Sequence, residues 1–243
     1  MRRDGRAADQ LREVKLLPNF TENPLGSVLS EIGRTRVLCT VTQESSVPRF
    51  LHGSGRGWLS AEYSMLPGST DRRTDREVSR GRASGRTLEI QRLIGRSLRA
   101  VVDLSALGDR TLWVDCDVLQ ADGGTRCAAI TGAYTALALS VRRLLRSGDL
   151  VRDPLRDSVA AVSAGIVGGD VMLDLAYEED SRAEVDMNVV ATGKGRFCEV
   201  QGTGEQATFS SEELGALTAV ALRGISDLTE LQRTAVADGD PER

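Results

Sequence analysis

A short run of small residues followed by an arginine stands where a phosphate could bind. Gly123-Gly124-Thr125-Arg126 joins a strand-like segment at 112–119 to a helical pattern at 125–146. The first N–H groups of a helix have no intrahelical acceptor and lie at the positive end of the helix dipole, so they favour an anion. Arg126 opposes that dipole, at a cost of roughly 0.3 kcal/mol or more, unless an anion lies beside it. The alternative is an ordinary strand-to-helix turn whose glycines serve only the backbone geometry.

A second arginine repeats this arrangement. Residues 87–103 carry apolar side chains at helical spacing, and Arg86 stands at the start of that pattern. Two helix starts that each carry an arginine can converge on one phosphate. The residues therefore predict an anion site made from Arg86, Gly124, Thr125 and Arg126.

An acidic segment offers ligands for a metal ion. Five acids and one arginine lie between 178 and 186. Asp186 opens a strand pattern, Asn188 projects from the same face two residues later, and Asp180 could reach the same point from the preceding loop. Two carboxylates and a neutral oxygen suit Mg²⁺, which keeps several waters and binds a substrate phosphate. The alternative is a solvated hairpin loop.

Positive charge is concentrated in one stretch, although the chain has a net charge of −4. Nine arginines and three acids lie between 72 and 99, and the stretch from 65 to 82 has little apolar content, which predicts a mobile loop. Such a block suits a polyanion. The alternative is a general preference for arginine, because Lys15 and Lys194 are the only lysines of the chain.

Several classes of protein are disfavoured by what the sequence contains. The single histidine, His52, lies in a glycine-rich loop, which argues against histidine-based catalysis. Lys194 follows glycine in a turn between two strands and does not open a helix, so a P-loop is excluded. The four cysteines have no CxxC spacing and are expected to be reduced core residues. No apolar run approaches the roughly 18 residues of a membrane span, and we expect a cytoplasmic protein without membrane contact.

The elements that must position these residues indicate an α+β fold. The first half predicts a hairpin over 28–42, the strand at 112–119 and the two helices. The second half predicts four strands and a last helix opened by Ser210 and Glu213, the strands being 158–167, 171–177, 185–191 and 196–201. We expect two βα lobes, 10–146 and 158–231, packed into one compact domain spanning 1–243, with a disordered tail at 235–243.

Taken in order, these segments resemble the RNase PH family, which is related to polynucleotide phosphorylase and to the exosome ring. The resemblance covers nearly the whole chain. It is carried by five blocks, namely Arg3-Asp4-Gly5-Arg6, residues 85–96, residues 115–134, Glu179-Asp180-Ser181 with residues 186–190, and residues 199–203.

The resemblance implies an RNase PH-type fold and a phosphate-dependent 3′→5′ exoribonuclease that trims transfer RNA precursors and releases nucleoside diphosphates. Inorganic phosphate would be the co-substrate, held by the four residues of the anion site. Asp180 and Asp186 would bind Mg²⁺ and take part in catalysis. The family further implies a homo-hexamer, a trimer of dimers, in which Arg72, Arg73 and Arg76 contact RNA with a single-stranded 3′ end.

The residues suggest how such a reaction would run. Phosphate attacks the last phosphodiester in line, so no covalent nucleophile is needed, and we expect Asp180 to protonate the leaving 3′ oxygen. Two alternatives remain open. One is an RNA-binding ring subunit without activity, and the other is a hydrolytic nuclease that does not use phosphate.

Overall fold

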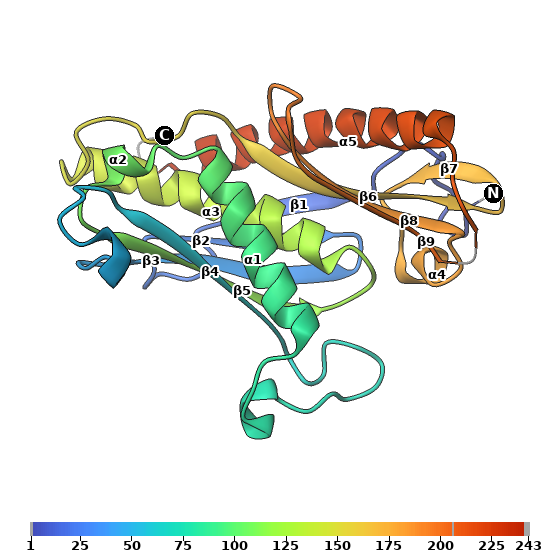
Figure 1. The fold of residues 1–243 in the computed structure, drawn as a ribbon, viewed down its shortest axis with the longest axis horizontal. Coiled ribbons are helices and arrows are strands. Elements are labelled where there is room, and N and C mark those ends of the chain that lie inside the picture. Colours follow the sequence, from blue (N-terminus) through green and yellow to red (C-terminus); the bar gives the residue numbers. More distant parts are fainter. Residues whose placement is uncertain (1, 206, 241–243) are drawn as a thin grey trace.

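Two sheets lie side by side in the computed structural model, which describes residues 2–205 and 207–240 (Figure 1). The first sheet has the strand order β1-β2-β3-β5-β4, and only β4 and β5 pair in parallel. Its strands are β1 (Val14–Pro18), β2 (Gly26–Ile32), β3 (Thr35–Glu44), β4 (Trp58–Met65) and β5 (Thr111–Gln120). The second sheet is antiparallel, in the order β7-β6-β8-β9. Its strands are β6 (Val159–Val167), β7 (Asp170–Leu173), β8 (Val185–Thr192) and β9 (Phe197–Gly204).

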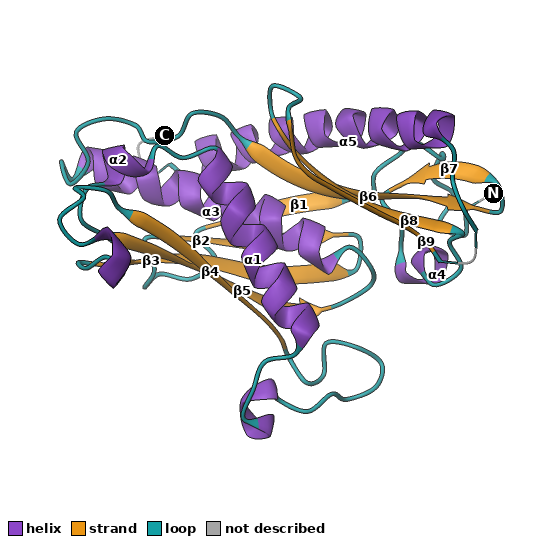
Figure 2. Cartoon of the chain, viewed as in Figure 1, coloured by secondary structure: helices purple, strands orange, loops and turns teal. Residues whose placement is uncertain are grey.

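Three long helices cover these sheets (Figure 2). α1 (Gly85–Ala100) and α3 (Thr125–Arg146) pack on the first sheet, and α5 (Ser211–Asp238) packs on the second. The short elements are α2 (Leu104–Leu107), α4 (Tyr177–Asp180) and two 3₁₀ helices, η1 (Arg49–Leu51) and η2 (Glu77–Arg80). Among the described residues, no helix is long and apolar enough to cross a membrane.

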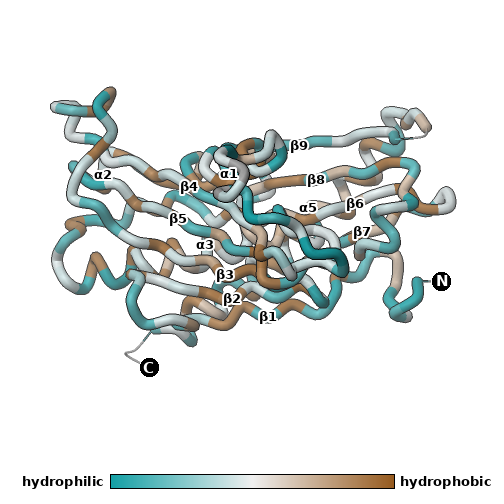
Figure 3. The backbone as a smooth tube through the Cα atoms, turned by 90° about the horizontal axis from the view of Figure 1, so that it is seen from below, coloured by the Kyte–Doolittle hydropathy of each residue, from teal (hydrophilic) through white to brown (hydrophobic). Residues whose placement is uncertain are grey.

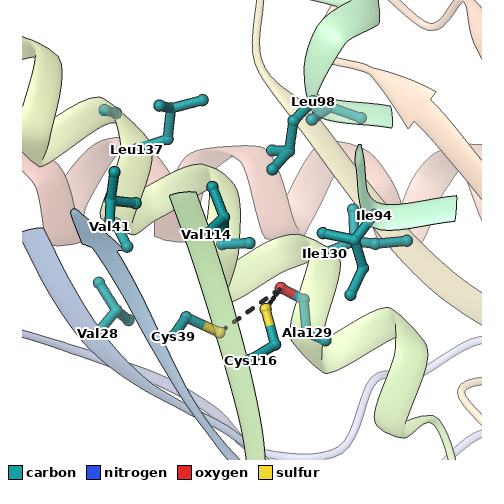
Figure 4. Close-up of a cluster of buried hydrophobic side chains, with 14 of the residues drawn as sticks. Val28, Cys39, Val41, Ile94, Leu98, Val114, Cys116, Ala129, Ile130 and Leu137 are labelled. Carbon is teal, nitrogen blue, oxygen red and sulfur yellow. Dashed lines mark hydrogen bonds between the residues drawn. The ribbon is translucent and has the colours of Figure 1, made fainter. Parts of the chain in front are cut away.

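Alternating strand residues build the first core against the helices. Val28, Cys39, Val114 and Cys116 point inward, and Ala129 of α3 lies over them (Figure 4). This alternation is the strand period of two, and the helices supply the matching apolar stripes. The second core lies between α5 and the inward residues of β6 and β8.

The two lobes are joined into one unit by α3 and α5. The side-chain amide of Gln232 on α5 donates to the carbonyls of Thr131 and Val159, each at 3.0 Å. Val159 and Ala235 from the second half also belong to the core cluster of the first half. The α+β class with two βα lobes is therefore confirmed.

The segment between β4 and α1 leaves the body of the molecule (Figure 1). Figure 3 shows this segment in front of the sheets as a largely hydrophilic stretch. Its base is fixed, because the N–H of Ala121 donates to the carbonyl of Ser69 at 2.8 Å. The arginine loop, which we define as residues 66–84, is thus anchored at the turn before α3.

Most predicted elements are present, with three differences. The strands β1 and β4 were not predicted. The strand expected at 171–177 ends at Leu173, and the acidic loop begins with the helix α4. The disordered tail is wrong for residues 235–240, because α5 continues to Asp238 and buries Ala235 and Val236. Residues 241–243 lie outside the described residues.

Candidate active site

The turn before α3 has the backbone geometry of an anion site. Gly123 and Gly124 adopt φ values of 76° and 65°, a region that favours glycine. Gly124 is the N-cap of α3, and it provides no side-chain cap. The first turn contains no acidic residue. The first N–H groups of α3 therefore have no side-chain acceptor at the cap, and they are available to a bound anion.

Two residues from the start of the chain hold this turn in place. The hydroxyl of Thr35 donates to the carbonyl of Gly123 at 2.7 Å and accepts the N–H of Asp122 at 2.9 Å. Arg12 donates from Nη1 to the carbonyl of Asp122 at 2.6 Å. The turn is therefore fixed from two directions before any ligand binds.

Arg12 also connects the turn to the acidic segment. Its Nε and Nη2 bond the two carboxylate oxygens of buried Asp174 at 3.0 and 2.7 Å. Asp174 has a φ of 52°, which a non-glycine residue adopts only when its surroundings enforce it. Arg2 adds to this support, because it donates to the carbonyl of Asp174 and to the carboxylate of Glu179 on α4. The guanidinium groups of Arg2 and Arg12 thus fix the backbone that leads into α4. Asp180 is the last residue of this helix.

Arg126 is held by residues from two other elements. Its side chain is 14% exposed and lies 3.6 Å from the carboxylate of Glu89 on α1. Nη1 of Arg126 also donates to Oε1 of Gln201 on β9 at 2.8 Å, and the Gln201 amide donates to Glu89 at 3.1 Å. This network orients the guanidinium at the start of α3.

Asp180 and Asp186 form an interacting pair of carboxyl groups. Burial, and after it the charge of the neighbouring Asp180, raises the pKa of Asp186 to about 6. Burial also raises the pKa of Asp180, whereas a hydrogen bond with Asp186 lowers it. The buried Oδ1 of Asp186 has no hydrogen-bond partner. Because its pKa is raised to about 6, Asp186 is the member of the pair that we expect to hold a proton, in place of Asp180.

Both predicted arginines act on this pair. The charges of Arg86 and Arg126 lower the pKa values of Asp180 and Asp186, opposing the effect of burial. Arg86 lies at the start of α1 and Arg126 at the start of α3, so charges from two helix starts act on the same two carboxyl groups.

The remaining predicted residues lie on β8 and in the arginine loop. Asn188 is two residues after Asp186 on β8, and its Oδ1 accepts from the Cys127 thiol at 3.3 Å. Arg72, Arg73 and Arg76 are exposed in the arginine loop, where Arg73 pairs with Asp75 at 3.0 Å. The four cysteines are free thiols, as expected.

The acidic pair suits a magnesium ion that is only partly coordinated by protein. Within residues 2–205 and 207–240, no cluster of three or more histidine, cysteine or acidic side chains could hold a metal. Mg²⁺ does not require one, since it commonly binds one or two carboxylates, waters and a substrate phosphate. The unpartnered Oδ1 of Asp186 is a buried oxygen that such an ion would satisfy. Asp180 and Asp186 therefore fit the ion.

Several supporting residues were missed by sequence reasoning. Gln201 was inside a block that carried the family resemblance, but its contact with Arg126 was not foreseen. Arg12 and Tyr63 gave no signal, because each acts on a residue far along the chain. The hydroxyl of Tyr63 donates to the Thr125 hydroxyl at 2.9 Å.

Comparisons with known proteins agree with this geometry. Models of the 3′ exoribonuclease family match residues 10–142 as domain 1 and residues 157–224 as domain 2. A protein of Bacillus subtilis named Ribonuclease PH is 55% identical over 243 residues, covering 100% of this chain and 99% of that protein. One of Bacillus mycoides with the same name is 56% identical over 239 residues, covering 98% of each.

Solved structures, among them one of an exosome, have the same fold. An Archaeoglobus fulgidus exosome with RNA bound to the active site has a chain that superimposes with a TM-score of 0.79 at 25% identity. The match covers 94% of this chain and 91% of that chain. Rice Rrp46 superimposes with a TM-score of 0.78 at 20% identity, covering 97% and 100%.

Proposed function

This chain belongs to the 3′ exoribonuclease family of RNase PH, and we propose on that premise that it is a phosphate-dependent 3′→5′ exoribonuclease. It trims the 3′ ends of transfer RNA precursors and releases nucleoside 5′-diphosphates by reversible nucleotidyl transfer to inorganic phosphate. The observation that carries the proposal is that the charges of Arg86 and Arg126 act on the same pair of aspartates.

Inorganic phosphate binds at the start of α3 in this proposal. Arg86 and Arg126 neutralise its charge, and the Thr125 hydroxyl and the first N–H groups of α3 donate hydrogen bonds to it. Gly124 has a φ of 65°, which glycine adopts without strain, and this turn presents the first N–H groups of α3 to the anion. Arg126 is already oriented by Glu89 and Gln201, so little reorganisation is required when the anion enters.

The reaction is an in-line displacement at phosphorus. An oxygen of inorganic phosphate forms a bond to the phosphorus of the last phosphodiester, and the bond from that phosphorus to the 3′ oxygen breaks. The leaving oxygen keeps the electron pair and takes a proton from Asp186, whose pKa of about 6 allows it to hold one near neutral pH. The products are a nucleoside 5′-diphosphate and an RNA shortened by one nucleotide. Positioning and charge neutralisation supply most of the rate enhancement.

Asp180 and Asp186 are the residues that would hold Mg²⁺. The bound ion supplies neutralisation of negative charge on the scissile phosphate. Because the pKa of Asp186 is about 6, both its protonated and its ionised forms are present near neutral pH, and the ionised form is a charged ligand for the ion. Asp186→Asn should therefore weaken the dependence of the rate on Mg²⁺, and a variant with a normal response to the ion would remove this residue from the metal site.

Arg72, Arg73 and Arg76 contact the RNA backbone in this proposal. Their exposure on a loop that extends from the body of the molecule supports this role (Figure 1). We also propose that the chain acts as one RNase PH domain in the cytoplasm, assembled as a homo-hexamer, a trimer of dimers. The edge strand β9 supports assembly, because it exposes apolar Phe197 and Val200. Sedimentation equilibrium tests this point, and a monomer of 26.1 kDa would contradict it.

One assay tests the proposed function. The protein is incubated with Mg²⁺ and a transfer RNA that carries extra 3′ nucleotides, with and without inorganic phosphate. We expect nucleoside diphosphates only when phosphate is present. Undiminished release of monophosphates without phosphate would indicate hydrolysis, and RNA binding without any product would indicate an inactive ring subunit.

A further inference from the structure

Tyr63 lies beneath the proposed phosphate site without belonging to its surface. It is on β4, its side chain belongs to the core of the first lobe, and the residue is 2% exposed. Its hydroxyl donates to Oγ1 of Thr125, the first residue of α3, at 2.9 Å. A buried tyrosine on one strand is thus bonded directly to a residue of the anion site.

The direction of this hydrogen bond follows from the chemistry of the two hydroxyls. Burial raises the pKa of Tyr63, so the phenol stays protonated, although the bond to Thr125 and the charges of Arg86 and Arg126 oppose the shift. A phenol is a stronger acid than an aliphatic alcohol and is the better donor of the two. Thr125 therefore accepts from Tyr63, and its own hydroxyl proton is free to point elsewhere.

Positive charge acts on this pair of hydroxyl groups. The charges of Arg86 and Arg126 lower the pKa of Tyr63, and Arg126 follows Thr125 directly at the start of α3. An anion drawn to these charges is an acceptor for the remaining hydroxyl proton of Thr125. Tyr63 is also joined to α1 itself, because its carbonyl accepts from the Gln91 side chain at 3.4 Å. Tyr63 thus contacts the start of α3 through its hydroxyl and the second turn of α1 through its carbonyl.

We propose that Tyr63 is a positioning residue for phosphate. By donating to Thr125, it prevents the Thr125 hydroxyl from turning inward and directs that proton at the bound anion. The inference rests on the proposed phosphate site and deepens it, since it assigns a task to a residue that does not touch substrate. The competing view is that Tyr63 only fills the core and satisfies its own hydroxyl.

Tyr63→Phe separates these views because it removes one oxygen and keeps the ring. We expect the KM for phosphate to rise about five-fold, in line with the loss of one oriented hydrogen bond. The kcat and the KM for RNA should stay within about two-fold, because neither reacting group nor RNA contact is removed. A core-filling role alone would lower the urea midpoint without changing the phosphate KM.

Two further variants sharpen the test. In a Thr125→Val background the added Tyr63→Phe change should have no further effect on the phosphate KM, because the hydroxyl that Tyr63 directs is gone. Tyr134→Phe is the matched control, since Tyr134 is a half-buried tyrosine of α3 that lies away from the helix start. It should leave the phosphate KM unchanged.

Phosphate binding measured without RNA distinguishes this inference from the proposed reaction. The probe is inorganic phosphate alone, and the readout is the rise in Tm that it causes in the full-length protein. We expect a smaller rise in Tyr63→Phe than in the unmodified chain. If no diphosphate is ever formed but Tyr63→Phe still weakens phosphate binding, the proposed reaction fails and the positioning role stands. An unchanged response to phosphate in Tyr63→Phe, or equal effects of that change with and without Thr125, would overturn the inference.

Discussion

Gly123 lies so close to the backbone of Tyr177 that a Cβ on the glycine would be 2.9 Å from the Tyr177 nitrogen. The turn before α3 and the start of α4 are therefore in direct contact. The first element presents Thr125 and Arg126, and the second carries Asp180. Because no side chain separates them, this backbone contact sets the distance between the phosphate site and the acidic pair together with the hydrogen bonds of Arg12.

Gly123→Ala should disrupt this contact. The new Cβ would also be 2.8 Å from the carbonyl oxygen of Leu175, so one of the two backbones must move. Gly148→Ala is the matched control, because Gly148 has a similar φ of 79° and nothing within 4 Å of its Cβ position. Both variants suffer strain from the positive φ, but we expect Gly123→Ala to lose about 2 kcal/mol more in urea denaturation. Equal losses of unfolding free energy in the two variants would show that the contact between Gly123 and the backbone before α4 has room for a Cβ.

Arg126→Ala should abolish most turnover while leaving RNA bound. A fixed charge that neutralises the attacking phosphate is worth about 100-fold or more in rate. We therefore expect kcat/KM for phosphate to fall by at least that factor, with RNA affinity changed less than about three-fold in a filter-binding assay. Arg223→Ala, on the exposed surface of α5, is the control and should behave as the unmodified chain. Unchanged phosphate dependence in Arg126→Ala would refute its assignment.

The acidic pair should make folding stability fall as pH rises. Asp186 keeps its proton to about pH 6 in the folded state, whereas the ordinary pKa is 3.8. The folded chain therefore binds more protons between these two values, so the free energy of unfolding decreases through that window. The expected decrease in the free energy of unfolding from Asp186 is on the order of 2 kcal/mol, after the screening of its charge by solvent is taken into account.

Asp186→Asn removes this pH-dependent loss. Urea denaturation at pH 4 and pH 7, without divalent cations, should show a smaller decrease for Asp186→Asn than for the unmodified chain. Asp170→Asn serves as the control, because Asp170 is exposed at the start of β7. If Asp186→Asn retains the full decrease, the buried proton is not on this carboxyl group.

The arginine loop should control how strongly salt weakens RNA binding. Each phosphate contact on single-stranded nucleic acid contributes about 0.7 to the slope of log affinity against log salt. Replacing Arg72, Arg73 and Arg76 by alanine should therefore reduce the slope by about 2, measured by fluorescence anisotropy. Alanine at Arg152, Arg223 and Arg233 removes three exposed arginines elsewhere and should leave the slope unchanged. A slope that falls with the second set of substitutions and not with the first would show that the arginine loop does not contact RNA.

Local sequence signals predicted the parts of the site that depend on local structure. The glycine turn and the helix after it were predicted because the two glycines, the change of period and the charge of Arg126 lie within a few residues. Arg86 was predicted for the same reason. The acidic residues were found as a group, but not the helix α4, because four residues are too short to show a helical period.

The remaining features depend on contacts between distant segments. Tyr63 is 62 positions from Thr125, and Arg12 is 162 positions from Asp174. No local pattern encodes such a pairing. The end of α5 was missed for a related reason, because Ala235 and Val236 are buried against the core of the first lobe. The sequence also could not predict that Asp186 holds the proton in place of Asp180. The raised pKa of Asp186 results from its burial and from the neighbouring Asp180, and both depend on the folded chain.

Labelled phosphate gives the most direct test of the account. The protein is incubated with Mg²⁺, unlabelled transfer RNA bearing extra 3′ nucleotides and inorganic phosphate labelled with ³²P, and the products are separated by chromatography. If phosphate held by Arg86 and Arg126 is the attacking group, the label will appear in the β-phosphate of the released nucleoside diphosphates. Label that stays in inorganic phosphate while unlabelled monophosphates accumulate would contradict the account.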